Sequence, residues 1–403
     1  MNKKYLFVLK ILLLICILII LFEISWFFYH EYKKNHNILY LDNINSYEYK
    51  NDSYVTVGVN NNNEKKINKA KVTKYNSKYE KIWEKLFNLG YNSEFLDISV
   101  DGDNNIISVG YYEKDKVESN KGITTAVIVK YDNDGNILFQ KDLQLMGNSK
   151  FNSILVVDDG YIVSGQSIYE DKTLGSQQGG AVLVKYNKQG RVLWKTNYGS
   201  SKNASYNDLV MVGDNIYAVG KDAIGTGIIS IYTMDGDRVD TFSYDSLDSN
   251  GFVSAVNISD NIYVIGTKVN SDFDTDGIIV KYDLDCDIVD DTVYSGRGFL
   301  SFDKIIKDNN DDLVVVGNMS VYNKKASNKK NKVYDYFGII GKYKENLEKV
   351  EVLEYGDSTE DFFTDVNIVN GNYLVVGYSC YEKEGYLSKF ITYSDALKVL
   401  EVK

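Results

Sequence analysis

The chain has 403 residues, a formal net charge of -11 at pH 7 and no proline. The negative charge disfavours binding to nucleic acid or to an anionic membrane surface, because both repel an acidic protein. The two histidines, His30 and His36, lie beside an N-terminal apolar segment, so the rest of the chain has no imidazole to act as a catalytic base or a zinc ligand.

The N-terminal segment is predicted to anchor the chain in a membrane. Residues 5–29 are almost continuously apolar, and as a helix they would span roughly 37 Å, enough for a hydrocarbon core of about 30 Å. Cleavage as a secretory signal is the alternative, but no Ala occurs before Ala70 and no Gly before Gly58, so nothing resembles a small-residue cleavage site. Residues 1–4 are expected to form a cytoplasmic tail and residues 30–43 a linker. The protein would then be single-pass in the cell membrane, with the rest of the chain outside the cytoplasm.

Beyond residue 43 the sequence repeats. The stretch AVIVKYDNDGNILFQKDL, which begins at Ala126, returns as AVLVKYNKQGRVLWKTNY at Ala181. Five further copies make seven, and in each the first residue is Ala or Gly, the third is aliphatic and the sixth is aromatic. A self-similar period of about 50 residues is typical of repeat architectures. The other copies begin at Ala70, Gly227, Gly277, Gly338 and Gly385.

Two further landmarks recur with each copy. Each copy follows an apolar run that ends in glycine, and a bulky residue opens another run 14 or 15 residues before that glycine. Each unit is therefore predicted to contain four short strands, and in three copies a glycine closes the turn between the last two. Four copies carry Tyr79, Cys286, Leu347 or Ser394 instead of this turn glycine, so their turns are expected to be of another type. The glycines that end the second strand are Gly58, Gly110, Gly165, Gly220, Gly266, Gly317 and Gly377, and the opening residues are Ile44, Phe95, Phe151, Tyr206, Phe252, Phe302 and Phe363.

The four strands per unit, the glycine that ends the second strand and the hairpin KYNKQGRVLW resemble the repeats of bacterial β-propellers of the kelch-like or SBBP-like kind. The resemblance implies an all-β, seven-bladed β-propeller over residues 44–403, with four antiparallel strands per blade. A ring covers both apolar faces of each sheet and leaves only short edges. We expect a monomeric ring that closes without exchange of strands between its first and last blades. The resemblance says little about activity, because propellers carry unrelated functions.

The sequence offers few catalytic or metal-binding patterns. Nucleotide-binding, serine-hydrolase and Cys-x-x-Cys motifs are absent, and the many carboxylates read as solvated turn residues, so we expect no catalysis and no cofactor other than a calcium ion. In SDFDTDGIIVKYD, Asp272, Asp274 and Asp276 alternate before Gly277, as at the start of a calcium loop. Because Gly277 aligns with the third strand of the other units, a calcium-binding loop and a plain acidic loop both remain open.

The longest loop between second and third strands, residues 323–333, carries five lysines. A run of like charge is usually a solvated face; the alternative is contact of Lys324, Lys325, Lys329 and Lys330 with an anionic partner. These loops share one face of the ring and vary in length, as recognition loops on a rigid scaffold do. The expected function is therefore binding or scaffolding of a protein or envelope partner on that face, without catalysis. A carbohydrate-binding or polysaccharide-active propeller is the alternative, and the 34 tyrosines favour it.

Overall fold

The computed structural model describes residues 42–403 with short gaps. The gaps are residues 63–66, 115–122, 144–146, 172–175, 200–203, 245–248, 272–273, 326, 328–332, 357–359, 382–384 and 395–396. The predicted anchor, residues 5–29, lies outside the described residues, and within them no helix is long and apolar enough to cross a membrane. The chain divides into two compact units, Met1–Tyr40 and Leu41–Lys403, and all described residues belong to the second.

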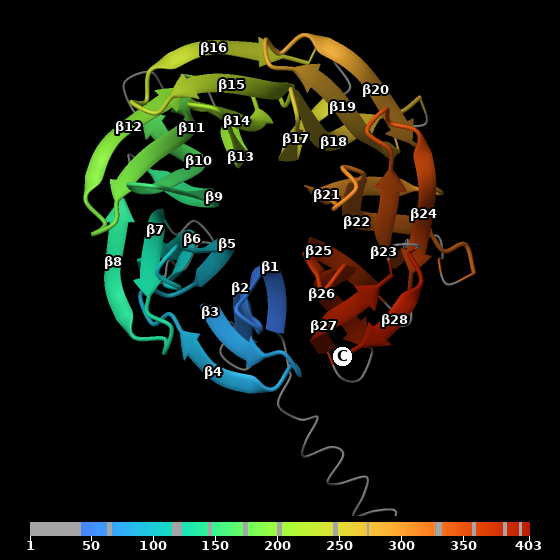
Figure 1. Ribbon diagram of the computed structural model, residues 1–403, viewed down its shortest axis with the longest axis horizontal. Coiled ribbons are helices and arrows are strands. Elements are labelled where there is room, and N and C mark those ends of the chain that lie inside the picture. Colours follow the sequence, from blue (N-terminus) through green and yellow to red (C-terminus); the bar gives the residue numbers. More distant parts are fainter. Residues whose placement is uncertain are drawn as a thin grey trace, which may run out of the picture. The chain divides into compact units, whose positions relative to one another are not determined.

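The regular structure of the described residues consists of 28 β-strands that pair in chain order. Six complete four-stranded antiparallel units and a seventh with a short outer strand form a ring around a central axis (Figure 1). The first strand of each unit lies nearest the axis and the fourth lies at the rim. Runs rich in Val, Ile and Tyr favour this arrangement, because such side chains pack well on a pleated, buried surface.

The strands of the first four units are β1 Asp42–Lys50, β2 Ser53–Asn62, β3 Ile67–Asn76, β4 Lys81–Leu86, β5 Ser93–Val100, β6 Ile106–Glu113, β7 Thr124–Tyr131, β8 Ile137–Leu143, β9 Asn148–Val157, β10 Gly160–Asp171, β11 Ser176–Asn187, β12 Val192–Tyr198, β13 Ser205–Val212, β14 Asn215–Lys221, β15 Gly227–Thr233 and β16 Arg238–Ser243. Those of the last three are β17 Ser249–Ile258, β18 Asn261–Val269, β19 Thr275–Asp283, β20 Ile288–Tyr294, β21 Phe299–Lys307, β22 Leu313–Tyr322, β23 Tyr334–Tyr343, β24 Lys349–Tyr355, β25 Glu360–Val369, β26 Asn372–Tyr381, β27 Gly385–Tyr393 and β28 Val399–Val402.

The seventh unit departs from the pattern that the sequence predicts. Lys389 pairs with Gly377, whereas in the second unit Val127, the second residue of the repeat, pairs with the equivalent glycine. The seventh copy therefore begins at Ser388 and not at Gly385, a shift of phase that an ungapped comparison of sequences misses. In addition, one parallel bridge joins the sixth and seventh units into an eight-stranded sheet.

The glycines predicted to end the second strands lie within those strands, and each stands opposite a β-bulge in the first strand. In the second unit Phe95 pairs with Gly110 and Asp97 pairs with Val109, so Leu96 is the extra residue. A Cβ on Gly110 would lie 2.0 Å from the carbonyl oxygen of Glu94. The requirement for glycine is thus a close approach of the backbone and not an unusual φ. The same shift of register recurs in all seven inner strands.

The core of the ring lies between the units. Among the described residues there are seven apolar clusters, and each combines side chains of two neighbouring units. The cluster between the first and last units contains Ile44, Tyr47, Leu374 and Phe390. Because neighbouring units cover both faces of each sheet, the third strands are apolar on both faces, as the sequence predicted; β7, for example, is buried on both faces, whereas the outer β8 is largely exposed.

The ring closes through side chains, without exchange of strands. No described sheet combines a strand from the first unit with one from the seventh. Instead, the Tyr47 hydroxyl donates a hydrogen bond to the carbonyl oxygen of Leu374 at 2.6 Å, and the Thr364 hydroxyl donates to the carbonyl oxygen of Ile44 at 2.7 Å. These bonds and the shared apolar cluster hold the first and last units together.

The turn between the third and fourth strands is the same in all seven units. In each, the turn residue has positive φ, for example 80° in Gly135 and 62° in Cys286, and its N–H donates to the carbonyl oxygen three residues earlier. The prediction of another turn type in the units without glycine is wrong. In the seventh unit the phase shift places Leu397, not Ser394, at the turn. The seven turn residues are Tyr79, Gly135, Gly190, Gly236, Cys286, Leu347 and Leu397.

The neighbouring unit decides whether the turn residue is glycine. Trp83 of the first unit lies over Gly135 of the second, where an added Cβ would come within 3.0 Å of its ring. Where an acidic residue replaces this aromatic, the turn residue of the next unit carries a side chain that fills the space, such as the buried Leu397 after Glu351. The other aromatic and glycine pairs are Phe139 with Gly190 and Trp194 with Gly236. The other acidic pairs among the described side chains are Asp240 with Cys286 and Asp290 with Leu347.

Candidate functional site

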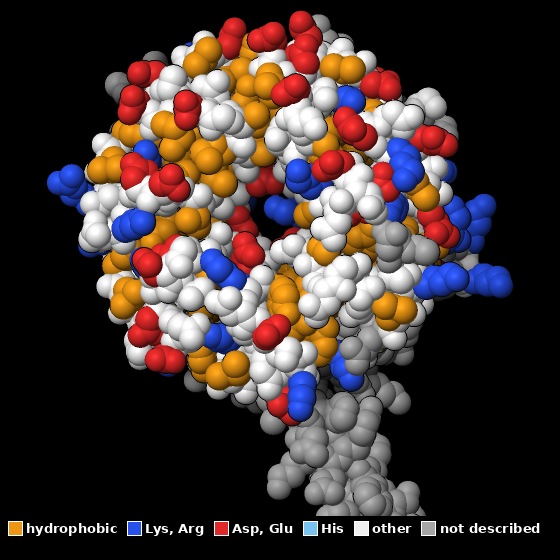
Figure 2. Space-filling model, viewed as in Figure 1, with side chains coloured by type: hydrophobic (Ala, Val, Ile, Leu, Met, Phe, Trp, Pro, Cys, Tyr) orange, Lys and Arg blue, Asp and Glu red, His pale blue; other side chains and the backbone are white. Residues whose placement is uncertain are grey.

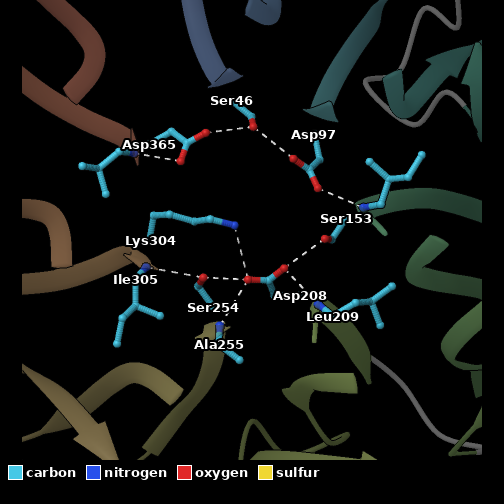
Figure 3. A network of polar contacts seen from close by, with 12 residues as sticks. Ser46, Asp97, Ser153, Asp208, Leu209, Ser254, Ala255, Lys304, Ile305 and Asp365 are labelled. Carbon is cyan, nitrogen blue, oxygen red and sulfur yellow. Dashed lines mark hydrogen bonds and ion pairs between the residues drawn. The ribbon is translucent and has the colours of Figure 1, made fainter. Parts of the chain in front are cut away.

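The ring is hollowed at its axis, where acidic and basic side chains are visible (Figure 2). The seven inner strands line this channel with a ring of polar side chains (Figure 3). Each stands two residues after the residue that opens its strand, directly after the bulge, and this shared position turns all of them toward the axis. We call these residues the polar girdle: Ser46, Asp97, Ser153, Asp208, Ser254, Lys304 and Asp365.

Asp208 of the girdle ties four units together. Its carboxylate accepts hydrogen bonds from the hydroxyls of Ser153 at 3.0 Å and Ser254 at 2.6 Å, which belong to the units on either side. It also accepts the backbone N–H of Ala255 at 3.2 Å. Lys304, one unit further, reaches the same carboxylate at 3.4 Å. A buried carboxylate with this many donors stabilises the ring as a whole.

Asp97 and Asp365 make the same kind of contact between units. Asp97 accepts the backbone N–H of Ile154 at 2.9 Å, and Asp365 accepts that of Tyr47 at 3.0 Å across the closure. The Ser46 hydroxyl lies 3.0 Å from Asp97 and 2.9 Å from Asp365. One hydroxyl carries one hydrogen, so the second of these contacts requires a protonated carboxyl group. Burial raises the pKa of Asp365 to about 6, which favours Asp365 as the carboxyl that takes up this proton.

Lys304 and Glu48 are two further strongly perturbed charges beside the girdle, and burial also raises the pKa of Asp303, which lines the channel, to about 7. Burial disfavours the charge on Lys304, but attraction by Asp208, Asp365 and Asp97 outweighs it and raises the pKa of the ammonium. Burial, together with Asp365 and Asp97, raises the pKa of Glu48 to about 7. The channel therefore combines one fixed positive charge with carboxyl groups that change protonation near neutral pH.

The girdle separates two cavities. A cavity of about 110 Å³ lies on the side of the bulge residues, and one of about 320 Å³ lies on the other side, where Glu48, Lys307 and Asn367 line it. Three asparagine side chains line the smaller cavity, and each donates a hydrogen bond to the carbonyl oxygen of the residue that opens the first strand of the next unit. These bonds run from Asn45 to Phe95 at 2.7 Å, from Asn152 to Tyr206 at 2.8 Å and from Asn207 to Phe252 at 2.7 Å.

The two faces of the ring differ. The first-to-second and third-to-fourth turns lie on one face and are short. On the opposite face, which we call the loop face, the hairpins between second and third strands project unequally. Pairing in the third unit continues to Asp171 with Ser176, six residues beyond the strand-two glycine, whereas in the fourth unit it stops at Lys221 with Gly227, one residue beyond.

Six aromatic side chains lie on the loop face of the sixth and seventh units. We call them the aromatic row: Phe299, Tyr322, Tyr334, Tyr336, Phe362 and Tyr378. The ring centroids of Tyr322 and Tyr334 are 5.8 Å apart, and those of Phe362 and Tyr378 are 5.0 Å apart. Phe299 is 40% and Tyr322 43% exposed. The sequence analysis missed this group, although its four tyrosines fall outside the positions at which the repeats place core aromatics.

The acidic loop of the fifth unit is described only in part. Asp272 lies outside the described residues. The Asp276 carboxylate accepts hydrogen bonds from the Asn270 amide at 3.2 Å and the Ser295 hydroxyl at 3.0 Å, and the Asp274 N–H donates to the Asn270 side chain. Over the described part of the chain, no group of three or more His, Cys, Asp or Glu could hold a metal ion. With Asp272 undescribed, the calcium hypothesis stays a prediction.

The predicted lysine site is also described in part. Lys324 and Lys325 lie exposed in the turn that follows β22, and the Lys325 N–H donates to the Asn323 side chain at 3.1 Å. Lys329 and Lys330 lie outside the described residues. Basic side chains gather on the part of the ring that contains β23 and β24 (Figure 2).

No protein-family model matches the chain, and no curated protein matches it in sequence. Among solved structures, the chain is similar to the propeller of Dos1 with a TM-score of 0.50 and 10% identity, over 87% of this chain and 93% of that one. The fold is a β-propeller. The chain is also similar to the acylaminoacyl peptidase of Pyrococcus horikoshii, with a TM-score of 0.51 and 9% identity over 92% of this chain and 53% of the peptidase. A third similar structure is a putative 6-phosphogluconolactonase from Bacteroides uniformis, with a TM-score of 0.51 and 12% identity over 88% of this chain and 96% of that one.

These comparisons correct one expectation. The sequence analysis expected no catalysis because the propeller contains no histidine and no known catalytic motif. The finding that similar structures include a peptidase and a putative lactonase contradicts that expectation. At these identities the likeness establishes the fold alone, and neither reaction is transferred to this chain.

Proposed function

We propose that this protein is a binding and scaffolding module of the cell envelope. In this proposal residues 5–29 anchor the chain in the cell membrane, the propeller lies outside the cytoplasm, and the loop face holds a protein or another envelope partner. We further assign the propeller seven blades of the kelch-like or SBBP-like type.

The difference between the two faces of the propeller carries this proposal. One face repeats a single turn geometry in every blade, while the hairpins on the loop face differ in length and composition. The polar girdle and the clusters between blades make the scaffold beneath these hairpins rigid. Binding residues are commonly found on variable loops that a rigid scaffold positions.

A carbohydrate partner is the second candidate, and the aromatic row favours it. Many tyrosines of the described residues fill repeated core positions, such as the fully buried Tyr131 and Tyr186. The tyrosines of the row do not, and they stand on the loop face with part of their surface exposed. Aromatic side chains offer large, rigid contact area with a polar edge.

Photo-crosslinking in intact cells tests the proposed function. A photoreactive residue replaces Lys325 on the loop face or, as the matched control, Gly213 on the opposite face, which is exposed and has nothing within 4 Å of its Cβ position. We expect a discrete captured product from position 325 and none from position 213, in the membrane fraction. Equal capture from both positions, or from neither, would contradict recognition on the loop face.

A further inference from the structure

The aromatic row follows the junction between the sixth and seventh blades. Tyr334 and Tyr336 alternate along β23 and so share one side of the strand. Gly338 is next on that side, and a Cβ there would lie 2.8 Å from the ring of Phe363 in the seventh blade. Tyr336 contacts Phe362 of the seventh blade at 5.2 Å between ring centroids, and Tyr334 contacts Phe299 at 6.2 Å. The rings thus form a row that crosses from one blade to the next.

The fold does not require a pair of aromatic residues at this place. Phe362 precedes the residue that opens the first strand of its blade, and Tyr378 follows the glycine of the second strand. In the second blade the equivalent positions are occupied by Glu94 and Tyr111. There the Tyr111 hydroxyl donates to the Glu94 carboxylate at 2.8 Å, a polar pair that serves the same blade architecture. The aromatic row is therefore a feature of one junction between blades and not of the repeat.

The exposed rings and their hydroxyls are available to a ligand. Phe299 and Tyr322 are the most exposed members of the row, at 40% and 43%. Within the described residues the hydroxyls of Tyr322, Tyr334 and Tyr336 donate no hydrogen bond. A ligand that fits such a surface has apolar ring faces bordered by hydroxyl groups, and this is the chemistry of a sugar chain.

The charge next to the row indicates that the sugar chain is acidic. Lys324 and Lys325 stand two and three residues after Tyr322 in the hairpin and are exposed. The whole protein carries a net charge of -11, so an anion is repelled by most of the molecule and attracted only where basic residues gather. This hairpin carries both aromatic rings and lysines. It therefore fits a polymer whose sugar rings can stack on the aromatic side chains while its carboxylate or phosphate groups contact the lysines.

We propose that the aromatic row together with Lys324 and Lys325 forms a binding site for an acidic polysaccharide. The proposal rests on the envelope-binding function proposed above and names the partner class. The row supplies the contact area and hydrogen bonds, and Lys324 and Lys325 supply attraction that salt weakens.

Binding of the full-length protein in detergent micelles to polygalacturonate, measured by affinity electrophoresis, tests the proposal. The variant Phe299→Ser with Tyr322→Ser removes the two most exposed rings, and we expect it to bind about tenfold more weakly. The variant Lys324→Ser with Lys325→Ser is expected to weaken binding by about tenfold at low salt and to reduce its salt dependence. The control variant Lys141→Ser with Lys195→Ser removes two exposed lysines of the outer strands β8 and β12 and is expected to bind like the wild type.

Each other outcome overturns the proposal. Binding that loses strength in the lysine variant but not in the aromatic variant means a contact of charge alone. Equal binding to polyglutamate identifies an acidic protein as the partner class, and equal binding to dextran a neutral glycan. Absence of binding to polygalacturonate, while position 325 still captures a partner in cells, refutes the polysaccharide site and leaves the proposed function standing. Absence of both refutes both.

Discussion

The pairing of aromatic and glycine residues between blades makes a quantitative prediction for Gly190. This turn residue has a φ of 77°, and an added Cβ would lie 2.9 Å from the ring of Phe139 in the preceding blade. Gly190→Leu would meet two costs: roughly 1–2 kcal/mol for positive φ in an L-residue and ~1–3 kcal/mol for overpacking against the ring. We expect the free energy of unfolding to fall by about 3 kcal/mol.

The matching change in the preceding blade, at the aromatic residue that faces Gly190, is Phe139→Glu. Removal of a buried phenylalanine costs roughly 3–5 kcal/mol, and this ring is half-buried, so a loss of ~2 kcal/mol follows. The double variant reproduces a combination that the ring already contains, Glu351 with Leu397. Leucine then fills the space that phenylalanine leaves, and only the cost of positive φ remains, about 2 kcal/mol. The double variant should thus be about 3 kcal/mol more stable than the sum of the single changes implies.

Urea unfolding of the four proteins, followed by circular dichroism, measures this coupling. Gly213→Leu is the control for φ alone, because Gly213 has a φ of 57° and nothing within 4 Å of its Cβ position. Gly213→Leu should lower the free energy of unfolding by the same amount whether or not Phe139→Glu is present. Additive effects at Gly190 and Phe139, within about 0.5 kcal/mol, would show that the two residues do not share the space between the blades and would refute the reasoning.

Three further predictions concern the scaffold, the hairpin and the channel. Gly165→Val should lower the free energy of unfolding by a few kcal/mol, because its Cβ would lie 2.0 Å from a backbone oxygen. Lys324→Ser with Lys325→Ser should change the free energy of unfolding by no more than about 0.5 kcal/mol. Similar melting temperatures of the two variants would contradict this division. Glu48 has a folded pKa of about 7, above its ordinary value, so the folded state binds more protons between about pH 4.5 and 7 and stability should fall as pH rises through that window. Glu48→Gln should make the fall shallower, and an unchanged slope would argue against protonation of Glu48. Removal of residues 1–35 should leave a soluble, monomeric β protein, as measured by light scattering and circular dichroism; an aggregated product would count against an independent propeller.

The strands and their order were predictable because their signals are local. Apolar alternation and the glycines that end each second strand recur in every copy, and the resulting four-stranded antiparallel units are present. The reason for those glycines was not predictable, since the bulge that presses the carbonyl oxygen of Glu94 against Gly110 lies on another strand. The turns at Cys286 and Leu347 were misjudged for a similar cause. Their strain is offset by burial between blades, and a window of sequence contains no information about the neighbouring blade.

The candidate sites were harder to predict than the fold. The polar girdle did leave a signal, because the residue two places after each strand-opening residue is Ser, Asp or Lys in every copy. Comparing the copies position by position at this offset would have revealed it. The aromatic row left a weaker signal, since Tyr336 and Phe362 come together only when β23 and β25 lie side by side. The convergence of such distant residues is a property of the ring.

The closure without strand exchange also bears on how such a ring can evolve. Every blade is built from one uninterrupted stretch of chain, and among the described residues no strand pairing joins the first and last blades, which meet through contacts of side chains such as Tyr47 and Asp365. Recombination between two repeats in the gene would delete or duplicate a whole sheet and would leave no sheet split between the ends of the chain. A descendant with a different number of blades would need only a new curvature and a new set of contacts at one junction. The number of repeats in such proteins is therefore free to change in single genetic events.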